Sequence, residues 1–247
     1  MAFCLNTNAA LILYTELTNN EFFVDKSGII KHFNKRIGTN SKFICITKPR
    51  RFGKTSVLNM LGAYYCKAYD SKSLFDTLEI SRADTYEQHL NQYHVINLCL
   101  SALSDKNDTY DDYIELFKSS IRRDIYKTYP HLANEDYYSI SELLTATNER
   151  FIFIIDEWDC IFRVGRGDIE AQTVYLDFLR ALLKDKAYVK LAYMTGILPI
   201  KKYGTHSALN MFDEYSMMNP GMLPQYVGFT EAEVRQLCQK YDMDFSD

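Results

Sequence analysis

The residues best suited to chemistry in this 247-residue chain are the nine from Thr47 to Thr55, Thr-Lys-Pro-Arg-Arg-Phe-Gly-Lys-Thr. An apolar segment precedes them and a helical pattern follows, and this layout predicts a phosphate-binding P-loop, or Walker A motif. Backbone N–H groups at a helix N-terminus point toward an anion, and the helix dipole favours negative charge there. We therefore expect Lys54 to reach the β- and γ-phosphates of a nucleotide and the Thr55 hydroxyl to bind Mg²⁺. Gly53 allows the backbone to approach the phosphates closely.

The start of this loop departs from the usual pattern, which has a glycine five residues before the Gly-Lys pair. Lys48 stands at that place and Pro49 follows it, so a bulky cation and a rigid ring replace a flexible entry. The motif alone leaves open a second interpretation, a surface loop in which Gly-Lys-Thr occurs by chance. Under the first interpretation, the nucleotide contacts come from the loop and the first helical turn: Pro49, Arg50, Arg51, Phe52, Gly53, Lys54, Thr55 and Ser56.

Two arginines lie inside the loop, and they can have different roles. One would contact phosphate, and the other would pair with an acidic residue such as Asp159. The sequence does not divide these roles between Arg50 and Arg51.

A second group of reactive residues follows the apolar run from Phe151 to Ile155, which ends in the carboxylates of Asp156 and Glu157. Such a run is typical of a strand buried on both faces of a parallel sheet, and ligands bind at the carboxyl ends of these strands. Asp156 is placed to hold Mg²⁺ directly or through water, as in a Walker B motif. Glu157 is placed to orient or deprotonate the water that attacks the γ-phosphate. The alternative is that Asp156 caps the strand end and Glu157 is solvated.

A third apolar run, Val189 to Gly196, carries a small polar residue near its end, Thr195. In many P-loop ATPases a strand between the P-loop strand and the acidic strand ends in a residue that senses the γ-phosphate. We expect the Thr195 strand to occupy this middle position and Thr195 to act in catalysis with Glu157 and Lys54. A threonine that bonds its own turn before Gly196 is the alternative.

The elements that must position these residues alternate along the chain, which predicts an α/β fold with helices on both faces of a mainly parallel sheet of about five strands. After a helical lead-in over residues 1–40, in which Ser27 caps a helix running to about Arg36, the expected strands are 43–46, 95–100, 151–155, 189–195 and, at one edge, 225–229. The expected helices cover 110–128, 139–148 and 171–184, and a last one starts near Thr230, where Thr230 and Glu233 fit a capping box. We expect one domain over residues 1–247.

A polar loop is expected between Asp159 and Ala171. It contains Arg163, Gly165, Arg166 and Gly167, so it could be mobile and supply an arginine to the transition state. A solvated loop without that role is the alternative, and composition favours it.

Composition and charge limit the other possibilities. The net charge of −4 argues against binding nucleic acid over the whole surface, which needs a basic face. The six cysteines form no Cys-x-x-Cys pair and lie in no zinc-binding pattern. The first residues of the sequence lack the charged start and long apolar core that are typical of a signal peptide. No apolar run is long enough to cross a bilayer. A cytoplasmic protein without membrane contacts is therefore expected; the oligomeric state is open.

The chain resembles the bacterial and archaeal AAA-ATPase-like proteins. The matching stretches run in the expected order over nearly the whole chain: 22–27, 48–55, 94–98, 154–159, 194–197 and 228–234. The family also lacks the first P-loop glycine and carries the Pro-Arg-Arg-Phe-Gly-Lys core, whereas it usually has Tyr at the position of Trp158. The resemblance implies ATP and Mg²⁺ as cofactors, with ATP hydrolysis. It also implies a PD-(D/E)XK nuclease-like domain after the ATPase domain, which we expect to lie outside this chain.

One further pair, Asp25-Lys26, belongs to a matching stretch. It precedes the P-loop strand, where many ATPases gather their adenine contacts, so both residues are candidates for cofactor binding. A plain helix cap is the other interpretation, and the role stays open.

Two kinds of function remain beyond nucleotide binding. The first is an ATPase that drives or switches a partner domain or protein, which the combination of Lys54, Thr55, Asp156 and Glu157 favours. The second is a regulatory or scaffold module that binds nucleotide without turning it over, which the altered loop entry keeps open. A DNA-processing ATPase is a weaker alternative because of the acidic charge balance.

Overall fold

The computed structural model describes residues 4–100, 110–164, 169–200, 209–219, 221 and 223–245. In this part of the chain, five strands form one sheet: β1 (Phe43–Thr47), β2 (His94–Cys99), β3 (Phe151–Asp156), β4 (Val189–Gly196) and β5 (Asp213–Tyr215). The strand order is β2-β3-β4-β1-β5, and every pairing is parallel. The α/β class, the number of strands and the middle position of the Thr195 strand between the P-loop and acidic strands are thereby confirmed.

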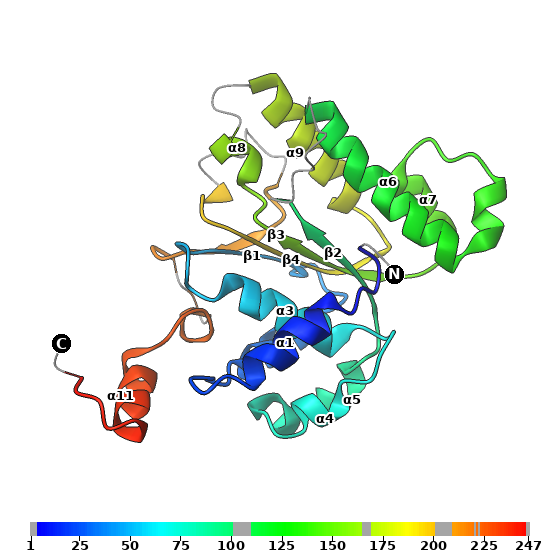
Figure 1. Ribbon diagram of the computed structural model, residues 1–247. Coiled ribbons are helices and arrows are strands. Elements are labelled where there is room, and N and C mark those ends of the chain that lie inside the picture. Colours follow the sequence, from blue (N-terminus) through cyan, green and yellow to red (C-terminus); the bar gives the residue numbers. More distant parts are fainter. Residues whose placement is uncertain are drawn as a thin grey trace.

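Helices cover both faces of the sheet (Figure 1). One face carries α6 (Tyr110–Thr128), α7 (Ile140–Ala146) and α9 (Ile169–Leu183), while α1 (Ala9–Thr18) and α3 (Lys54–Tyr65) lie on the other. Shorter elements complete the described chain: the helices α2 (Ile30–Asn34), α4 (Lys72–Phe75), α5 (Tyr86–His89), α8 (Cys160–Val164) and α11 (Glu231–Lys240), and the 3₁₀ helices Ser27–Ile29, Glu79–Arg82, Pro130–Asn134 and Pro224–Tyr226.

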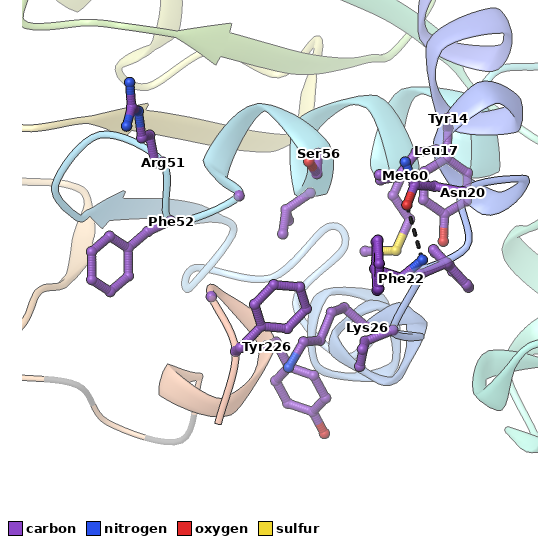
Figure 2. A pocket seen from close by; sticks show the side chains of 16 residues that line it. Tyr14, Leu17, Asn20, Phe22, Lys26, Arg51, Phe52, Ser56, Met60 and Tyr226 are labelled. Atoms are coloured by element: carbon purple, nitrogen blue, oxygen red, sulfur yellow. Dashed lines mark hydrogen bonds between the residues drawn. The ribbon is translucent and has the colours of Figure 1, made fainter. Parts of the chain in front are cut away.

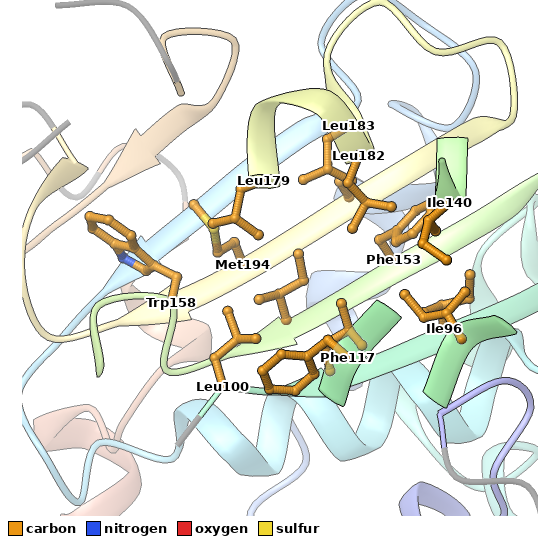
Figure 3. Close-up of a cluster of buried hydrophobic side chains, with 14 of the residues drawn as sticks. Ile96, Leu100, Phe117, Ile140, Phe153, Trp158, Leu179, Leu182, Leu183 and Met194 are labelled. Atoms are coloured by element: carbon orange, nitrogen blue, oxygen red, sulfur yellow. The ribbon is translucent and has the colours of Figure 1, made fainter. Parts of the chain in front are cut away.

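The two faces of the sheet bury separate clusters of apolar side chains. Because side chains alternate along a strand, Phe153 and Met194 point toward α9, whereas Ile154 and Tyr193 pack against the α3 layer. Figure 3 shows the first cluster, with Trp158 at one end of it. All six residues of β3 are buried, as expected for a central strand covered on both faces. This burial fixes the strand whose carboxyl end carries the acidic pair.

Long amphipathic segments form where their periodicity predicts them. The helix expected over 110–128 is α6, and its apolar residues Ile114, Phe117, Ile121 and Ile125 are buried. The Thr230–Glu233 capping box is present at the start of α11. The helices α7 and α9 begin or end within a few residues of their predicted limits.

Three local predictions are wrong. Residues 225–229 are not a strand: a 3₁₀ turn covers Pro224–Tyr226 and Gly228 has a φ of 95°, while the edge strand is the short, acidic β5. Ser27 does not cap one long helix, because its hydroxyl accepts the Ile80 N–H and the helix is split at Ile29. The loop expected after Asp159 begins with a helix, α8, while the predicted loop residues Gly165, Arg166 and Gly167 lie outside the described residues.

Within the described residues, no helix has both the length and the apolar character needed to cross a lipid bilayer.

Candidate nucleotide-binding site

The start of α3 is built to receive an anion. Gly53 precedes it with a φ of 74°, a left-handed conformation that glycine adopts without strain. No side chain caps this helix, so the N–H groups of its first turn have no partner from a capping residue. These groups and the positive end of the helix dipole face the same point.

Lys54 lies at this point with its ammonium group turned back into the loop. Its Nζ donates hydrogen bonds to the carbonyl oxygens of Lys48, at 2.9 Å, and Pro49, at 2.8 Å. The side chain is buried, and burial lowers the pKa of the ammonium group, although Asp156 opposes this shift. A phosphate would supply the negative charge that the two neutral carbonyls lack.

The other end of the site is the contact between the P-loop helix and the acidic strand. The Thr55 hydroxyl donates a hydrogen bond of 2.9 Å to Oδ2 of Asp156, and Oδ1 of Asp156 accepts the Glu157 N–H at 3.0 Å. Burial raises the pKa of the Asp156 carboxyl, and the Thr55 hydrogen bond offsets part of this shift.

The hydroxyl oxygen of Thr55 and Oδ2 of Asp156 fit a magnesium ion. Mg²⁺ binds oxygen ligands at about 2.0–2.1 Å in octahedral geometry, which puts neighbouring ligands about 3 Å apart. The distance of 2.9 Å between Thr55 Oγ1 and Asp156 Oδ2 agrees with that spacing. Phosphate oxygens and water would supply the remaining ligands.

Glu157 is held by an arginine from the next helix. Its backbone has a φ of 52°, a left-handed conformation that is uncommon for a residue other than glycine. Oε2 of Glu157 accepts a hydrogen bond of 2.8 Å from Nη2 of Arg163, in α8. Nε of Arg163 lies 3.4 Å from Oδ2 of Asp159, so one guanidinium group is shared by two carboxylates.

Asp159 is fully buried and bridges to the segment that follows β4. Its Oδ2 accepts the backbone N–H groups of Ile197, at 3.0 Å, and Leu198, at 2.9 Å. The predicted pairing of Asp159 with an arginine of the P-loop is wrong, because Arg163 takes that place. Arg50 and Arg51 are exposed, and neither forms an ion pair with a described residue.

Thr195 lies at the carboxyl end of β4, between β1, which leads into the P-loop, and β3, which ends in Asp156. It is fully buried, and its hydroxyl has no hydrogen-bond partner among the described residues. Its carbonyl accepts the Trp158 N–H at 3.0 Å. The side chain therefore makes no hydrogen bond to its own turn in the described structure.

Lys48, which stands where a glycine is usual, is compatible with the P-loop. Its N–H bonds to the Gly196 carbonyl at 3.1 Å and extends the β1–β4 pairing by one residue. Its side chain is buried, with Nζ 5.7 Å from the centre of the Phe52 ring. Burial lowers the pKa of this ammonium group.

A cavity of about 490 Å³ adjoins the P-loop (Figure 2). Its volume and its aromatic and aliphatic walls are typical of a small-molecule site. The P-loop side contributes Phe52, Gly53 and Ser56; Arg51 also lines the cavity, but Figure 2 shows its side chain directed away from the Phe52 and Tyr226 rings. Most of the opposite wall comes from two distant segments of the chain: Leu17, Asn20, Phe22, Phe23, Val24, Lys26, Tyr226, Gly228 and Phe229.

Apart from Lys26, the residues of this opposite wall were missed as individual candidates. Phe22, Phe23, Gly228 and Phe229 belong to the stretches that carry the family resemblance, so that signal was present in the sequence. Gly228 lies against Phe52: a Cβ atom there would be 3.0 Å from the ring.

The structure separates the pair Asp25-Lys26. Asp25 accepts the Ser27 N–H at 2.7 Å and the Glu79 N–H at 2.6 Å, so both of its oxygens stabilise local structure. Lys26 lines the cavity, and its Nζ bonds to the Gln225 carbonyl at 2.6 Å and to Glu233 in α11 at 2.5 Å.

With this geometry established, the comparisons with known proteins identify the family. The family model described as "Predicted AAA-ATPase" matches residues 13–205, more than three quarters of the chain. The chain belongs to this predicted AAA-ATPase family. A search of curated proteins gave no significant match. The region matched by the family model contains the P-loop, the acidic pair and Thr195, but not the cavity wall at Tyr226–Phe229.

Proposed function

We propose that this chain binds Mg-ATP and hydrolyses it, and that the cycle switches a partner domain or protein. The observation that carries the proposal is the contact between Thr55 and Asp156, at 2.9 Å. It joins a P-loop helix start without a side-chain cap to an acidic strand end, which is the arrangement needed to hold a nucleotide phosphate and its metal ion.

In this proposal the phosphates lie on the N–H groups at the start of α3. Lys54 exchanges the carbonyl groups of Lys48 and Pro49 for phosphate oxygens, which are better partners for an ammonium group. The nucleoside enters the adjacent cavity, where Phe52, Tyr226 and Phe229 offer ring faces for the base. Arg50 and Arg51, which are free of ion pairs in the described structure, are available to the phosphate tail.

Glu157 is the proposed general base. It would accept a proton from the water that attacks the γ-phosphate. Thr195, whose buried hydroxyl is unpartnered in the described residues, is the proposed sensor of that phosphate. Thr55 and Asp156 would hold Mg²⁺, which would supply positive charge to neutralise the charge developing on the phosphates.

We further propose that the partner is a nuclease-like domain and that the protein works in the cytoplasm. Both follow from the family resemblance and composition. A direct role in processing DNA is less favoured because the net charge is −4.

A nucleotide-binding module without turnover is the second candidate, and a specific contact favours it. Glu157 is paired with Arg163 at 2.8 Å, and a carboxylate stabilised by a guanidinium group is a weaker base than a free one. A chain that kept this pair in its nucleotide complex would bind ATP and not hydrolyse it.

The test compares wild type with Glu157→Gln for Mg-ATP binding by calorimetry and for phosphate release. Glutamine keeps the size of the side chain but cannot act as the base, so we expect similar affinity and a rate lowered by about 10²–10⁴-fold. Glu16→Gln, an exposed change on α1, serves as the matched control and should leave both measurements unchanged.

Two other outcomes would contradict parts of the proposed function. If wild type binds ATP but never releases phosphate, even with a partner domain or nucleic acid added, the module without turnover is correct. If Glu157→Gln hydrolyses ATP at the wild-type rate, Glu157 is not the base. Asp159 would be the next carboxylate to test, although its burial argues against direct contact with water.

A further inference from the structure

A continuous set of contacts links the acidic pair to the end of β4. Asp156 accepts the Glu157 N–H, Glu157 accepts from Arg163, and Arg163 lies beside Asp159. Asp159 in turn holds the N–H groups of Ile197 and Leu198, directly after β4. We call Glu157, Arg163 and Asp159 the carboxylate latch.

The latch depends on which hydrogen bonds Asp156 accepts. In this structure the two oxygens of Asp156 are taken by the Thr55 hydroxyl and the Glu157 N–H. A cation bound to Oδ2 of Asp156 would displace the Thr55 hydrogen bond, and by neutralising the carboxylate it would weaken the hydrogen bond that Oδ1 accepts from the Glu157 N–H. Left-handed backbone is unfavourable at a residue other than glycine and persists only where the surroundings impose it. Glu157 therefore has a favourable conformation to relax into once the Asp156 contact weakens.

The residues around the carboxylate latch are packed so closely that its side chains have little room to move by small steps. A Cβ atom on Gly196 would lie 2.6 Å from the Trp158 ring and 2.9 Å from Oδ1 of Asp159. Trp158 is fully buried. Its backbone N–H donates to the Thr195 carbonyl, and its carbonyl accepts a hydrogen bond of 2.5 Å from the Tyr175 hydroxyl. Close-packed groups of this kind move between discrete arrangements.

We propose that Arg163 holds Glu157 away from catalysis in the nucleotide-free protein, and that binding of Mg-nucleotide releases Glu157 from Arg163. This inference rests on the proposed function. Arg163 is then a positioning residue that acts through Glu157. Through Asp159, the same release alters the backbone after β4, so the state of the nucleotide site is transmitted along that strand.

Trp158 lies between Glu157 and Asp159 in the sequence and is the only tryptophan in the chain, so its fluorescence reports on the latch. We expect a saturating non-hydrolysable imido analogue of ATP, with Mg²⁺, to shift the Trp158 emission to the red as water gains access. Arg163→Gln and Glu157→Ala should show this shift without nucleotide, and the double variant should match the single ones. Arg180→Gln, an exposed change on α9, is the matched control and should behave as wild type.

A conservative variant guards against misfolding, since Arg163→Gln leaves the buried Asp159 without its cationic partner. Arg163→Lys keeps the charge but cannot contact both carboxylates as a planar guanidinium does, so we expect an intermediate emission. Glu157→Ala disrupts the latch from its more exposed side and leaves the contact between Arg163 and Asp159 in place.

Calorimetry on the same samples separates the possible failures. If the analogue binds and the wild-type emission is unchanged, the latch is wrong while the proposed function stands. Additive shifts in the double variant would also overturn the latch. If the analogue binds and shifts the emission but ATP is never hydrolysed, the latch stands and hydrolysis is wrong. If no nucleotide binds, both proposals are wrong.

Discussion

Under the proposed function, Lys54 has two roles in one site. Without nucleotide its ammonium group stabilises the loop by bonding the carbonyls of Lys48 and Pro49. These bonds satisfy a buried charge, which would otherwise be costly. A bound phosphate would take over that role, so the loop is preorganised around the group that the ligand needs.

We predict that Lys54→Ala folds but binds Mg-ATP at least 10-fold more weakly. Hydrogen bonds to charged groups contribute about 1.5–3 kcal/mol, which corresponds to about 10–150-fold in affinity. Calorimetry measures the affinity, and thermal unfolding checks the fold. Lys127→Ala, an exposed change on α6, is the control for loss of charge alone. Equal affinity in wild type and Lys54→Ala would rule out the role assigned to Lys54.

The residues of the site differ in how well sequence could predict their partners. The Gly53-Lys54-Thr55 spacing predicts a helix start and the N–H groups that this start presents to an anion, because local backbone chemistry determines both. The partner of Asp159 could not be predicted in the same way. Arg50, Arg51 and Arg163 were all available as cations, and only the formation of α8 brings Arg163 within 3.4 Å of Asp159.

Among the elements, the packing of α1 against α3 depends on one glycine. Gly62 lies in the interior of α3, and a Cβ atom there would be 2.6 Å from the Cβ of Ala10 in α1. It would also lie 3.4 Å from Oδ1 of Asn97 in β2. The helix cannot move aside easily, because the sheet lies on its other face.

We predict that Gly62→Ala lowers the free energy of unfolding by up to about 2 kcal/mol. Helix propensity alone would stabilise the variant by about 1 kcal/mol, but overpacking costs about 1–3 kcal/mol. Chemical denaturation measures the change. In the control Gly28→Ala, the three atoms nearest to the new methyl group all belong to the half-exposed carboxylate of Glu79, which can rotate away. A Gly62→Ala protein more stable than wild type would contradict this packing argument.

The elements that sequence predicts well are long or fully buried. The periodicity of α6 predicts a helix with one buried face, and the continuous apolar runs of β1, β3 and β4 predict buried strands. Few alternative structures fit these segments. The short β5, Asp-Glu-Tyr, has no such pattern, and its pairing with β1 is a tertiary effect. Residues 225–229 have strand-like side chains, but the Gln225 carbonyl bonds to Lys26 instead of a neighbouring strand.

For the molecule as a whole, buried histidines make stability depend on pH. Burial lowers the pKa of His32, His89 and His94 below the usual value of 6.5. Asn6 donates to Nδ1 of His94 at 2.8 Å, so Nε2 carries the proton and lies 3.0 Å from the Tyr129 hydroxyl. The folded protein therefore favours the neutral ring.

We predict that stability falls as the pH is lowered from 7 to 5, and that His94→Gln reduces this dependence. Below pH 6.5 the unfolded chain binds a proton at His94 that the folded chain does not, so the free energy of unfolding rises with pH in this window. One such proton contributes at most about 1.4 kcal/mol per pH unit. Urea denaturation at several pH values measures the slope. An unchanged slope in His94→Gln would show that His94 does not contribute.

The cavity beside the P-loop is assembled from chain segments that leave the ribosome at very different times. Its P-loop side is complete at Ser56, but its last wall residue is Phe229. At about 5–20 residues per second, synthesis of the intervening segment takes roughly 10–35 s. During that interval a nascent chain has its phosphate-binding loop but lacks the wall that would enclose a nucleoside. Under the proposed function, full nucleotide affinity would arise only late in synthesis, after all the strands of the described sheet have been made.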